Sequence, residues 1–125
     1  MIFNTGIDII EVERIQEMME KYGERFQKRL YTQTEIDYCE SFKETKYVHY
    51  AARFAAKEAF SKAIGTGLTQ GFKFVEVGIR NEKSGLPVLE LSGGMFEKWG
   101  DYKIHVSLSH TRGNAIAVVI MEKID

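Results

Sequence analysis

Asp8 is the first residue of the chain whose setting points to chemistry, because it lies within the apolar run 6–10. A buried carboxylate is costly unless a partner compensates its charge. The residue types leave two interpretations open. Asp8 belongs to a polar functional site, or it is an acid at a sheet edge or a helix cap.

A second group of charged residues lies in the alanine-rich segment 51–63. It contains one acid, Glu58, and three cations, Arg53, Lys57 and Lys62. Glu58 and Lys62 are four residues apart, so both lie on one face of a helix. On an exposed helix such a pair would stabilise by only about 0.3–0.5 kcal/mol. The apolar and aromatic neighbours instead favour a phosphate cradle with a metal ligand inside it.

These two groups together match the ligand preference of magnesium. Mg²⁺ requires near-octahedral oxygen ligands and usually takes one or two carboxylates, then water and substrate phosphates. Asp8 and Glu58 would supply the two carboxylates, and a pyrophosphate would supply further oxygens. The predicted chemistry therefore centres on one divalent ion and a diphosphate.

The segment Gly65-Thr66-Gly67 is similar to a phosphate-binding loop only in composition. It follows a helix, whereas anions favour the N-terminal end of the dipole. No Lys-Ser or Lys-Thr pair follows, so a P-loop is rejected. A C-terminal helix cap is the better interpretation, and close approach of a ligand to bare backbone remains the alternative.

Polar residues alternate along segment 105–111. Alternation places on one strand face His105, Ser107, Ser109 and Thr111. This face is either simply solvated or a row of hydrogen-bond donors for phosphates. Ser109 and His110 do not form a hydrolase dyad, because adjacent strand residues point to opposite faces.

A ridge of basic residues follows the first expected helix at steps of four, three and four. Its members are Arg14, Met18, Lys21 and Arg25. Spacing alone favours a solvated helix face. A basic ridge with a methionine also suits an acidic helical partner.

The pattern of apolar residues and turn signals predicts the elements that hold these residues. We expect strands at 2–10, 72–80, 87–91, 103–109 and 114–121. We expect helices at 11–22, 24–30, about 34–42 and 47–64, with one helical turn at 95–99. Thr32 and Glu35 form a capping box before the third helix, and Gly23 ends or bends the first.

A helical run followed by a strand run predicts the α+β class, with a long helix packed on an antiparallel sheet. Segment 115–121 is apolar without alternation, which predicts a strand buried on both faces. One extra buried face in so small a protein suggests an oligomer.

The 125 residues fit one domain, which we place at 1–125. The formal net charge of −1 gives no general positive field for nucleic acid or a membrane surface. The single cysteine, Cys39, cannot form an intrachain disulfide and favours a reducing compartment. The first 15 residues do not resemble a signal peptide, and the longest apolar run is far below the about 20 residues of a membrane span. We therefore expect a cytoplasmic protein.

Three segments together resemble the holo-acyl-carrier-protein synthase family of phosphopantetheinyl transferases. They are Gly6-Ile7-Asp8, the segment 54–67 (FAAKEAFSKAIGTG) and the segment 106–111 (VSLSHT). Each segment is weak alone. Their order in a chain of this length is highly specific, and the resemblance spans nearly the whole chain.

The resemblance implies a compact α+β subunit that assembles into a homotrimer with an active site at each subunit junction. It implies that Asp8 and Glu58 bind Mg²⁺ and that Lys62 lies near the reacting phosphate. The positions that it assigns to coenzyme A are Arg53, Ser61, Lys62, Gly65, Pro87, His105 and Ser109. It also implies that an acyl carrier protein docks on Arg14, Met18, Lys21 and Arg25.

The implied reaction is Mg²⁺-dependent transfer of 4′-phosphopantetheine from coenzyme A to a carrier-protein serine, with release of 3′,5′-ADP, in fatty acid biosynthesis. Glu58, Asp8 and a metal-bound water remain open as the base for the serine. Three other interpretations compete with it. A broad-range transferase would be about twice as long, because two halves share one chain. A coenzyme A-binding module would not need both acids, and a purely structural domain leaves Asp8 unexplained.

Overall fold

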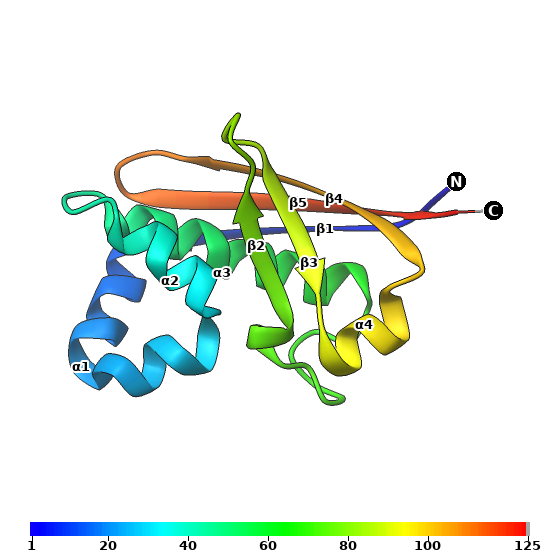
Figure 1. The fold of residues 1–125 in the computed structure, drawn as a ribbon, viewed down its shortest axis with the longest axis horizontal. Helices are drawn as coiled ribbons and strands as arrows, with labels where there is room; N and C mark the ends of the chain where they lie inside the picture. Colours follow the sequence, from blue (N-terminus) through cyan, green and yellow to red (C-terminus); the bar gives the residue numbers. More distant parts are fainter. Residues whose placement is uncertain (125) are drawn as a thin grey trace.

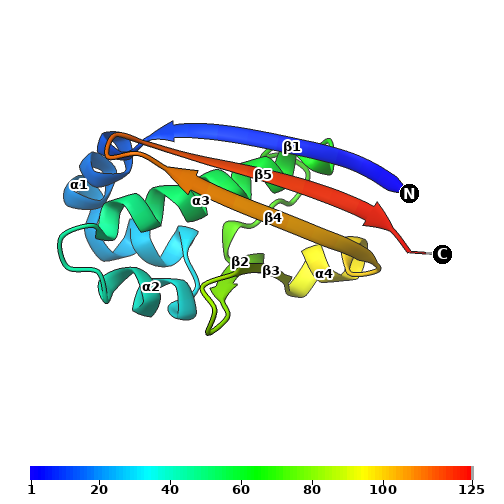
Figure 2. The same ribbon diagram turned by 90° about the horizontal axis from the view of Figure 1, so that it is seen from above.

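The computed structural model describes residues 1–124 and is built on a three-stranded antiparallel sheet with helices on one face (Figure 1). The strands stand in the order β1 (Ile2–Glu11), β5 (Asn114–Lys123) and β4 (Tyr102–His110). The long helix α3 (Lys46–Ala63) runs along the inner face of this sheet, as Figure 2 shows from above. These features confirm the predicted α+β class. Residue 125 of the predicted domain lies outside the described residues.

Small residues allow α3 and β1 to approach each other closely. The alanines of α3 are all buried. Gly6 of β1 faces this helix, and a Cβ atom added to it would lie 1.9 Å from the carbonyl oxygen of Ala59. Only glycine fits so close to another backbone. Because side chains alternate along a strand, Asp8 also faces α3 from the same side of β1.

The central strand β5 is covered on its inner face alone. Its inner residues are buried against α3, while its outer residues are only partly buried. The outer face of the sheet, called here the open sheet face, carries the apolar residues Ile7, Ile9, Ile116, Val118 and Ile120. The prediction that segment 115–121 is buried on both faces is therefore wrong for the single chain, whose outer face is apolar but open.

The helix α1 (Val12–Leu30) joins the two predicted helical pieces through a kink. Gly23 lies at the kink with φ 63° and ψ −141°, a left-handed conformation that favours glycine. The helix α2 (Gln33–Glu40) begins at the predicted capping box, where the Thr32 hydroxyl accepts from the Glu35 N–H at 3.2 Å. Within residues 1–124, no helix has both the length and the apolar character that crossing a bilayer requires.

The segment predicted as one strand at 72–80 is divided in two. A 3₁₀ turn, η1 (Phe74–Glu76), comes first, and the strand β2 (Val77–Asn81) follows. The carbonyls of Phe74 and Val77 turn inward to the ammonium of Lys57, which prevents a regular strand through η1.

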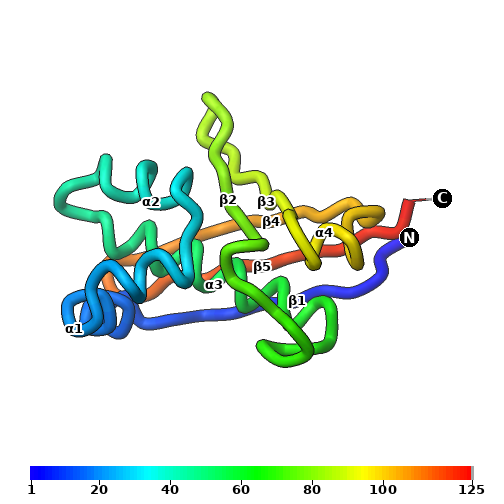
Figure 3. Tube along the Cα trace, turned by 60° about the horizontal axis from the view of Figure 1, so that its bottom comes forward, coloured from blue at the N-terminus to red at the C-terminus, as the bar shows by residue number. Residues whose placement is uncertain are grey.

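The strands β2 and β3 (Pro87–Leu91) form a separate two-stranded sheet beside the main one, and α4 (Gly93–Trp99) follows β3. Their turn projects from the body of the protein, as Figure 3 shows.

Candidate active site

Asp8 and Lys62 form an ion pair where β1 lies against α3. Lys62 Nζ lies 3.1 Å from Asp8 Oδ1 and donates to the carbonyl oxygen of Ile7 at 2.9 Å. The Asp8 side chain is only 13% exposed. A carboxylate so far removed from water requires such a partner, so Asp8 is part of a polar site rather than an idle surface acid.

Glu58 lies one helical turn before Lys62 and belongs to the same charged group. Burial raises the pKa of the Glu58 carboxyl above its ordinary value, and the negative charge of Asp8 raises it further. The positive charges of Lys62 and Arg14 act in the opposite direction. The structure therefore brings the two predicted acids together, with Lys62 and Arg14 as their cationic neighbours.

A cavity of about 280 Å³, the first cavity, opens between β1, α1 and α3 beside these acids. Its charged lining consists of Asp8, Arg14, Glu17 and Glu58. Two crowded carboxylates fit a divalent cation, because positive charge between them relieves their repulsion. Their oxygens are the hard ligands that Mg²⁺ prefers, and two protein carboxylates suffice when a substrate supplies phosphate oxygens.

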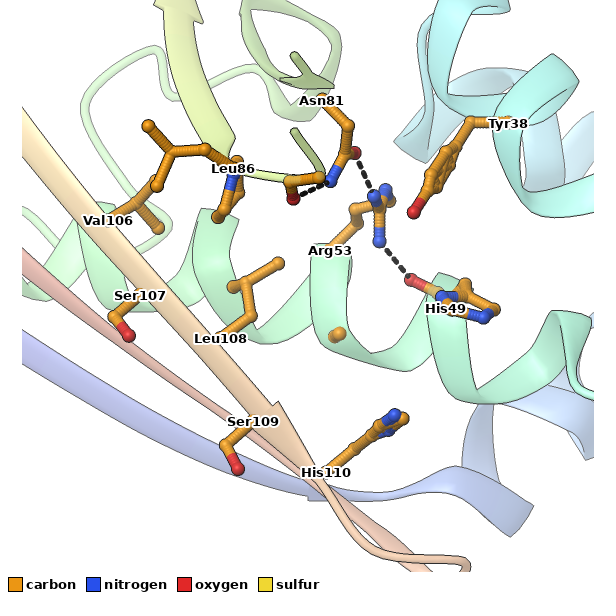
Figure 4. Close-up of a pocket in the computed structure, with 13 residues that line it drawn as sticks. Tyr38, His49, Arg53, Asn81, Leu86, Val106, Ser107, Leu108, Ser109 and His110 are labelled. Carbon is orange, nitrogen blue, oxygen red and sulfur yellow. Dashed lines mark hydrogen bonds between the residues drawn. The ribbon is translucent and has the colours of Figure 1, made fainter. Parts of the chain in front are cut away.

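A second cavity, of about 460 Å³, lies between α2, α3, β4 and the turn of the β2–β3 hairpin (Figure 4). Arg53 reaches into it from α3. Its guanidinium stacks 4.3 Å from the centroid of the Tyr38 ring and donates to the His49 carbonyl oxygen at 3.2 Å and to the Asn81 side chain. Although Arg53 is only 2% exposed, its Nε has no hydrogen-bond partner. A guanidinium keeps its positive charge, so its presence in the lining of this cavity favours an anionic ligand.

Two histidines also face the second cavity. The rings of His49 and His110 lie 5.9 Å apart, and His49 stacks on Phe42 at 3.9 Å. Burial lowers the pKa of His49, and the positive charge of Arg53 and the nearby His110 lower it further. Figure 4 shows His110 on the side of β4 that faces α3.

Residues 4–119 match the sequence profile of the 4′-phosphopantetheinyl transferase superfamily. The chain belongs to this superfamily. It is therefore a transferase, as the resemblance predicted. A holo-[acyl-carrier-protein] synthase of Syntrophus aciditrophicus is 42% identical over 125 residues, which cover 98% of this chain and 97% of the relative.

Solved structures of this superfamily share the fold over nearly the whole chain. A holo-(acyl-carrier-protein) synthase from Bacillus anthracis, in complex with CoA (3′,5′-ADP), has a TM-score of 0.84 at 37% identity and covers 99% of both chains. The Helicobacter pylori holo-[acyl-carrier-protein] synthase in complex with coenzyme A has a TM-score of 0.82 at 30% identity. The alignment covers 94% of this chain and 99% of that one.

The residues that the family resemblance assigns to coenzyme A do not all lie together in this transferase. Arg53, Pro87 and Ser109 line the second cavity, although the Ser109 hydroxyl points to the other side of β4 in Figure 4. His105 lies on the outer face, where its Nε2 is 3.0 Å from a carboxylate oxygen of Glu122. Its role in coenzyme A binding stays a prediction.

Ser61 belongs to α3, and Gly65 follows the end of this helix. The Ser61 hydroxyl donates to the carbonyl oxygen of Glu58 at 2.6 Å, within its own helix. Gly65 has φ 83° and its N–H donates to the Lys62 carbonyl oxygen, so it forms the predicted helix cap. Lys62 is the one assigned residue in direct contact with Asp8.

The predicted cradle of three cations around Glu58 is wrong. Lys57 points away from the acid, and its Nζ lies 2.8 Å from Glu35 in the core. Arg53 points into the second cavity instead. Residues one to five positions apart on a helix differ in direction by multiples of about 100°. The sequence alone does not show which faces of the helix are covered by other parts of the protein.

Sequence reasoning missed three residues that line the second cavity, Tyr38, His49 and Asn81, and gave His110 no role. One signal was present for His110, because alternation placed it on the same face as Val106 and Leu108. No comparable signal marked Tyr38, His49 or Asn81, which come from three different elements.

The basic ridge on α1 is divided between two cavities. Arg14 and Met18 line the first cavity, and Met18 also lines a third cavity of about 460 Å³ with Arg25. The third cavity is completed by Tyr22, Phe26 and Arg29. Lys21 lines neither, and its Nζ lies 5.3 Å from the centroid of the Tyr22 ring.

Proposed function

We propose that this chain is a holo-acyl-carrier-protein synthase, which transfers 4′-phosphopantetheine from coenzyme A to a serine of apo acyl carrier protein and releases 3′,5′-ADP. The main support for this proposal is that the carboxylates of Asp8 and Glu58 lie close together beside the ammonium of Lys62. The names of the relatives and the coenzyme A complexes of two of them support it. The product would serve fatty acid biosynthesis in the cytoplasm.

Asp8 and Glu58 would hold Mg²⁺ in this reaction, and the ion would neutralise negative charge on the pyrophosphate. Lys62 lies next to both acids and would place its ammonium beside the same phosphates. It would stabilise the negative charge of the departing 3′,5′-ADP. The serine proton would pass to Glu58, to Asp8 or to water.

The second cavity would take the nucleotide end of coenzyme A. The buried Arg53 guanidinium and the two imidazoles would bind a phosphate. Tyr38 offers an aromatic ring and Leu86 an apolar side chain for the rest of the nucleotide. In one chain this cavity lies along β4, whereas Asp8 lies on β1, at the opposite edge of the three-stranded sheet. One coenzyme A reaching both would bridge two copies.

A homotrimer would bring the β1 edge of one subunit next to the β4 edge of another. The open sheet face offers the apolar surface for it, since Ile7 and Ile9 are 57% and 65% exposed. Large exposed apolar patches mark interaction sites. Active sites at subunit junctions follow from this arrangement.

The carrier protein would dock on α1. Arg14 and Arg25 border cavities that share the exposed thioether of Met18, which is 40% exposed. Arg25→Glu should raise the KM for carrier several-fold and leave the KM for coenzyme A unchanged, with an effect that weakens in salt. The matched control is Lys98→Glu on α4. Equal changes in both KM values would contradict docking on α1.

The direct test is the mass of the carrier. Incubation with coenzyme A, Mg²⁺ and apo carrier protein should add one phosphopantetheine arm, and a chelator should prevent the addition. An unchanged carrier mass, with coenzyme A bound, would contradict transfer and leave a coenzyme A-binding module.

A further inference from the structure

A buried ion pair between Lys57 and Glu35 lies in the core, apart from the residues assigned to the reaction. Lys57 Nζ is 2.8 Å from Glu35 Oε1, and both side chains are 0% exposed. Every other ion pair within residues 1–124 has at least one side chain in contact with solvent. Removing one partner of such a pair is costly, because it leaves an uncompensated charge in the core.

Apart from the bond between its two members, this pair, called here the Lys57–Glu35 clamp, makes all its hydrogen bonds to backbone groups. Lys57 Nζ also donates to the carbonyl oxygens of Phe74 at 2.9 Å and Val77 at 2.8 Å. The second Glu35 oxygen accepts from the Ile79 N–H at 3.0 Å, and the first accepts from the N-cap N–H of α2 at 2.8 Å. The clamp therefore joins α2, α3, η1 and β2.

Three of the four walls of the second cavity come from these same elements. Tyr38 belongs to α2, Arg53 to α3 and Asn81 to the end of β2, while β4 forms the fourth wall. The hairpin forms no ladder with the main sheet within residues 1–124. Its polar attachment to α3 runs through the clamp at its base and the Arg53–Asn81 hydrogen bond at its tip.

We propose that the Lys57–Glu35 clamp positions the β2–β3 hairpin against α3 and thereby sets the affinity of the second cavity for the nucleotide end of coenzyme A. Lys57 and Glu35 touch no reacting atom, so both are positioning residues. The identity of the ligand rests on the proposed function. The proposed metal site consists of Asp8 on β1 and Glu58, whose side chain lines the first cavity while that of Lys57 lies in the core. Its behaviour should not depend on the clamp.

The test replaces Lys57 by methionine and measures binding of 3′,5′-ADP by calorimetry together with both KM values. A small misplacement of a group at the site can cost up to about 100-fold in reaction rate. We expect about 10-fold weaker 3′,5′-ADP binding and a matching rise in the KM for coenzyme A. The KM for carrier and the Mg²⁺ concentration for half-maximal rate should stay unchanged. Lys46→Met on the same helix, which removes the exposed pair with Glu40, is the matched control.

A Lys57→Met protein that binds 3′,5′-ADP like the wild type would overturn the proposed role of the clamp. An equal rise in the KM values for coenzyme A and for carrier would overturn it as well. If this variant does not fold, Lys57→Met with Glu35→Gln replaces it, because no unpaired charge remains. If neither folds, hydrogen exchange at the Ile79 amide of the wild type decides: added 3′,5′-ADP should slow it, and unchanged exchange overturns the clamp. Wild-type protein that binds 3′,5′-ADP but loads no carrier would contradict the proposed function alone.

Discussion

At the scale of single residues, the pKa of His49 is lowered first by burial and then by its neighbours in the second cavity. Arg53 and His110 are the charged and titratable groups that act on it, and both lower its pKa in addition to burial. A neutral His49 stacks on Phe42 and lies beside a permanent cation without repulsion. The cavity therefore keeps this imidazole neutral at neutral pH.

This lowered pKa predicts a loss of stability in mild acid. Below the ordinary value of 6.5 the unfolded chain takes up a proton at His49 more readily than the folded chain does. The free energy of unfolding should therefore fall as the pH drops from 8 through 6.5 towards the folded-state pKa. His49→Phe keeps the stacking and should reduce this fall in urea unfolding. If the free energy of unfolding of His49→Phe fell equally steeply with pH, this role of His49 would be contradicted.

The two acids were predictable from residue type and local pattern, but their companions were not. Asp8 stood out as a carboxylate in an apolar strand, and its Lys62 partner lies 54 positions away. Lys57 and Arg53 were wrongly grouped with Glu58, because helical spacing gives relative directions and not the neighbours on each side. Those neighbours are long-range contacts, such as Glu35 and Asn81.

At the scale of elements, the contact of β1 with α3 determines where Asp8 lies. The backbones meet at Gly6, where an added Cβ atom would lie 1.9 Å from the Ala59 carbonyl oxygen. A backbone atom cannot move aside as a flexible side chain can. The position of Asp8 against α3 therefore depends on the absence of a side chain two residues earlier.

Gly6→Ala should destabilise the protein by about 1–3 kcal/mol, the range for overpacking, and should lower transfer activity further by displacing Asp8. The free energy of unfolding in urea measures the first effect, and the mass of loaded carrier the second. Gly113→Ala is the matched control, since an added Cβ there meets nothing within 4 Å. Equal stability of Gly6→Ala and Gly113→Ala would contradict the close contact.

Most elements followed from local sequence signals, and the exceptions have a tertiary cause. The capping box at Thr32, the strand Pro87–Leu91 and the long helix α3 match their predictions closely. Segment 72–80 does not match its prediction, because the buried ammonium of Lys57 on α3 binds two of its carbonyl oxygens. The apolar segment 115–121 predicts burial but not which surface covers each face.

At the scale of the whole molecule, the open sheet face is the feature that a single chain leaves unexplained. Pairing places the outer residues in rows across the sheet, and Ile7, Val118 and Ser107 form one such row. Apolar side chains at the centre with polar ones along β4 are typical of an interface core with a polar rim. The proposed trimer would cover this face.

Val118→Glu should therefore convert the proposed trimer to a smaller species in native mass spectrometry and abolish transfer, because each active site would lose the neighbouring subunit. A charge without a partner in an interface core is costly. Phe96→Glu, on α4 below the sheet in Figure 1, should leave the trimer intact. A Val118→Glu protein of unchanged mass would contradict assembly through the open sheet face.

The most direct test concerns the ion that Asp8 and Glu58 are proposed to share. Electron paramagnetic resonance can count Mn²⁺ bound to each chain in the presence of coenzyme A. Wild-type protein should bind one ion per active site, and Asp8→Asn and Glu58→Gln should each weaken binding by about 10-fold or more, as loss of a metal-site residue does. Glu17→Gln, a carboxylate in the same cavity, should bind like the wild type. Wild-type affinity for Mn²⁺ in Asp8→Asn or Glu58→Gln would contradict a shared metal site.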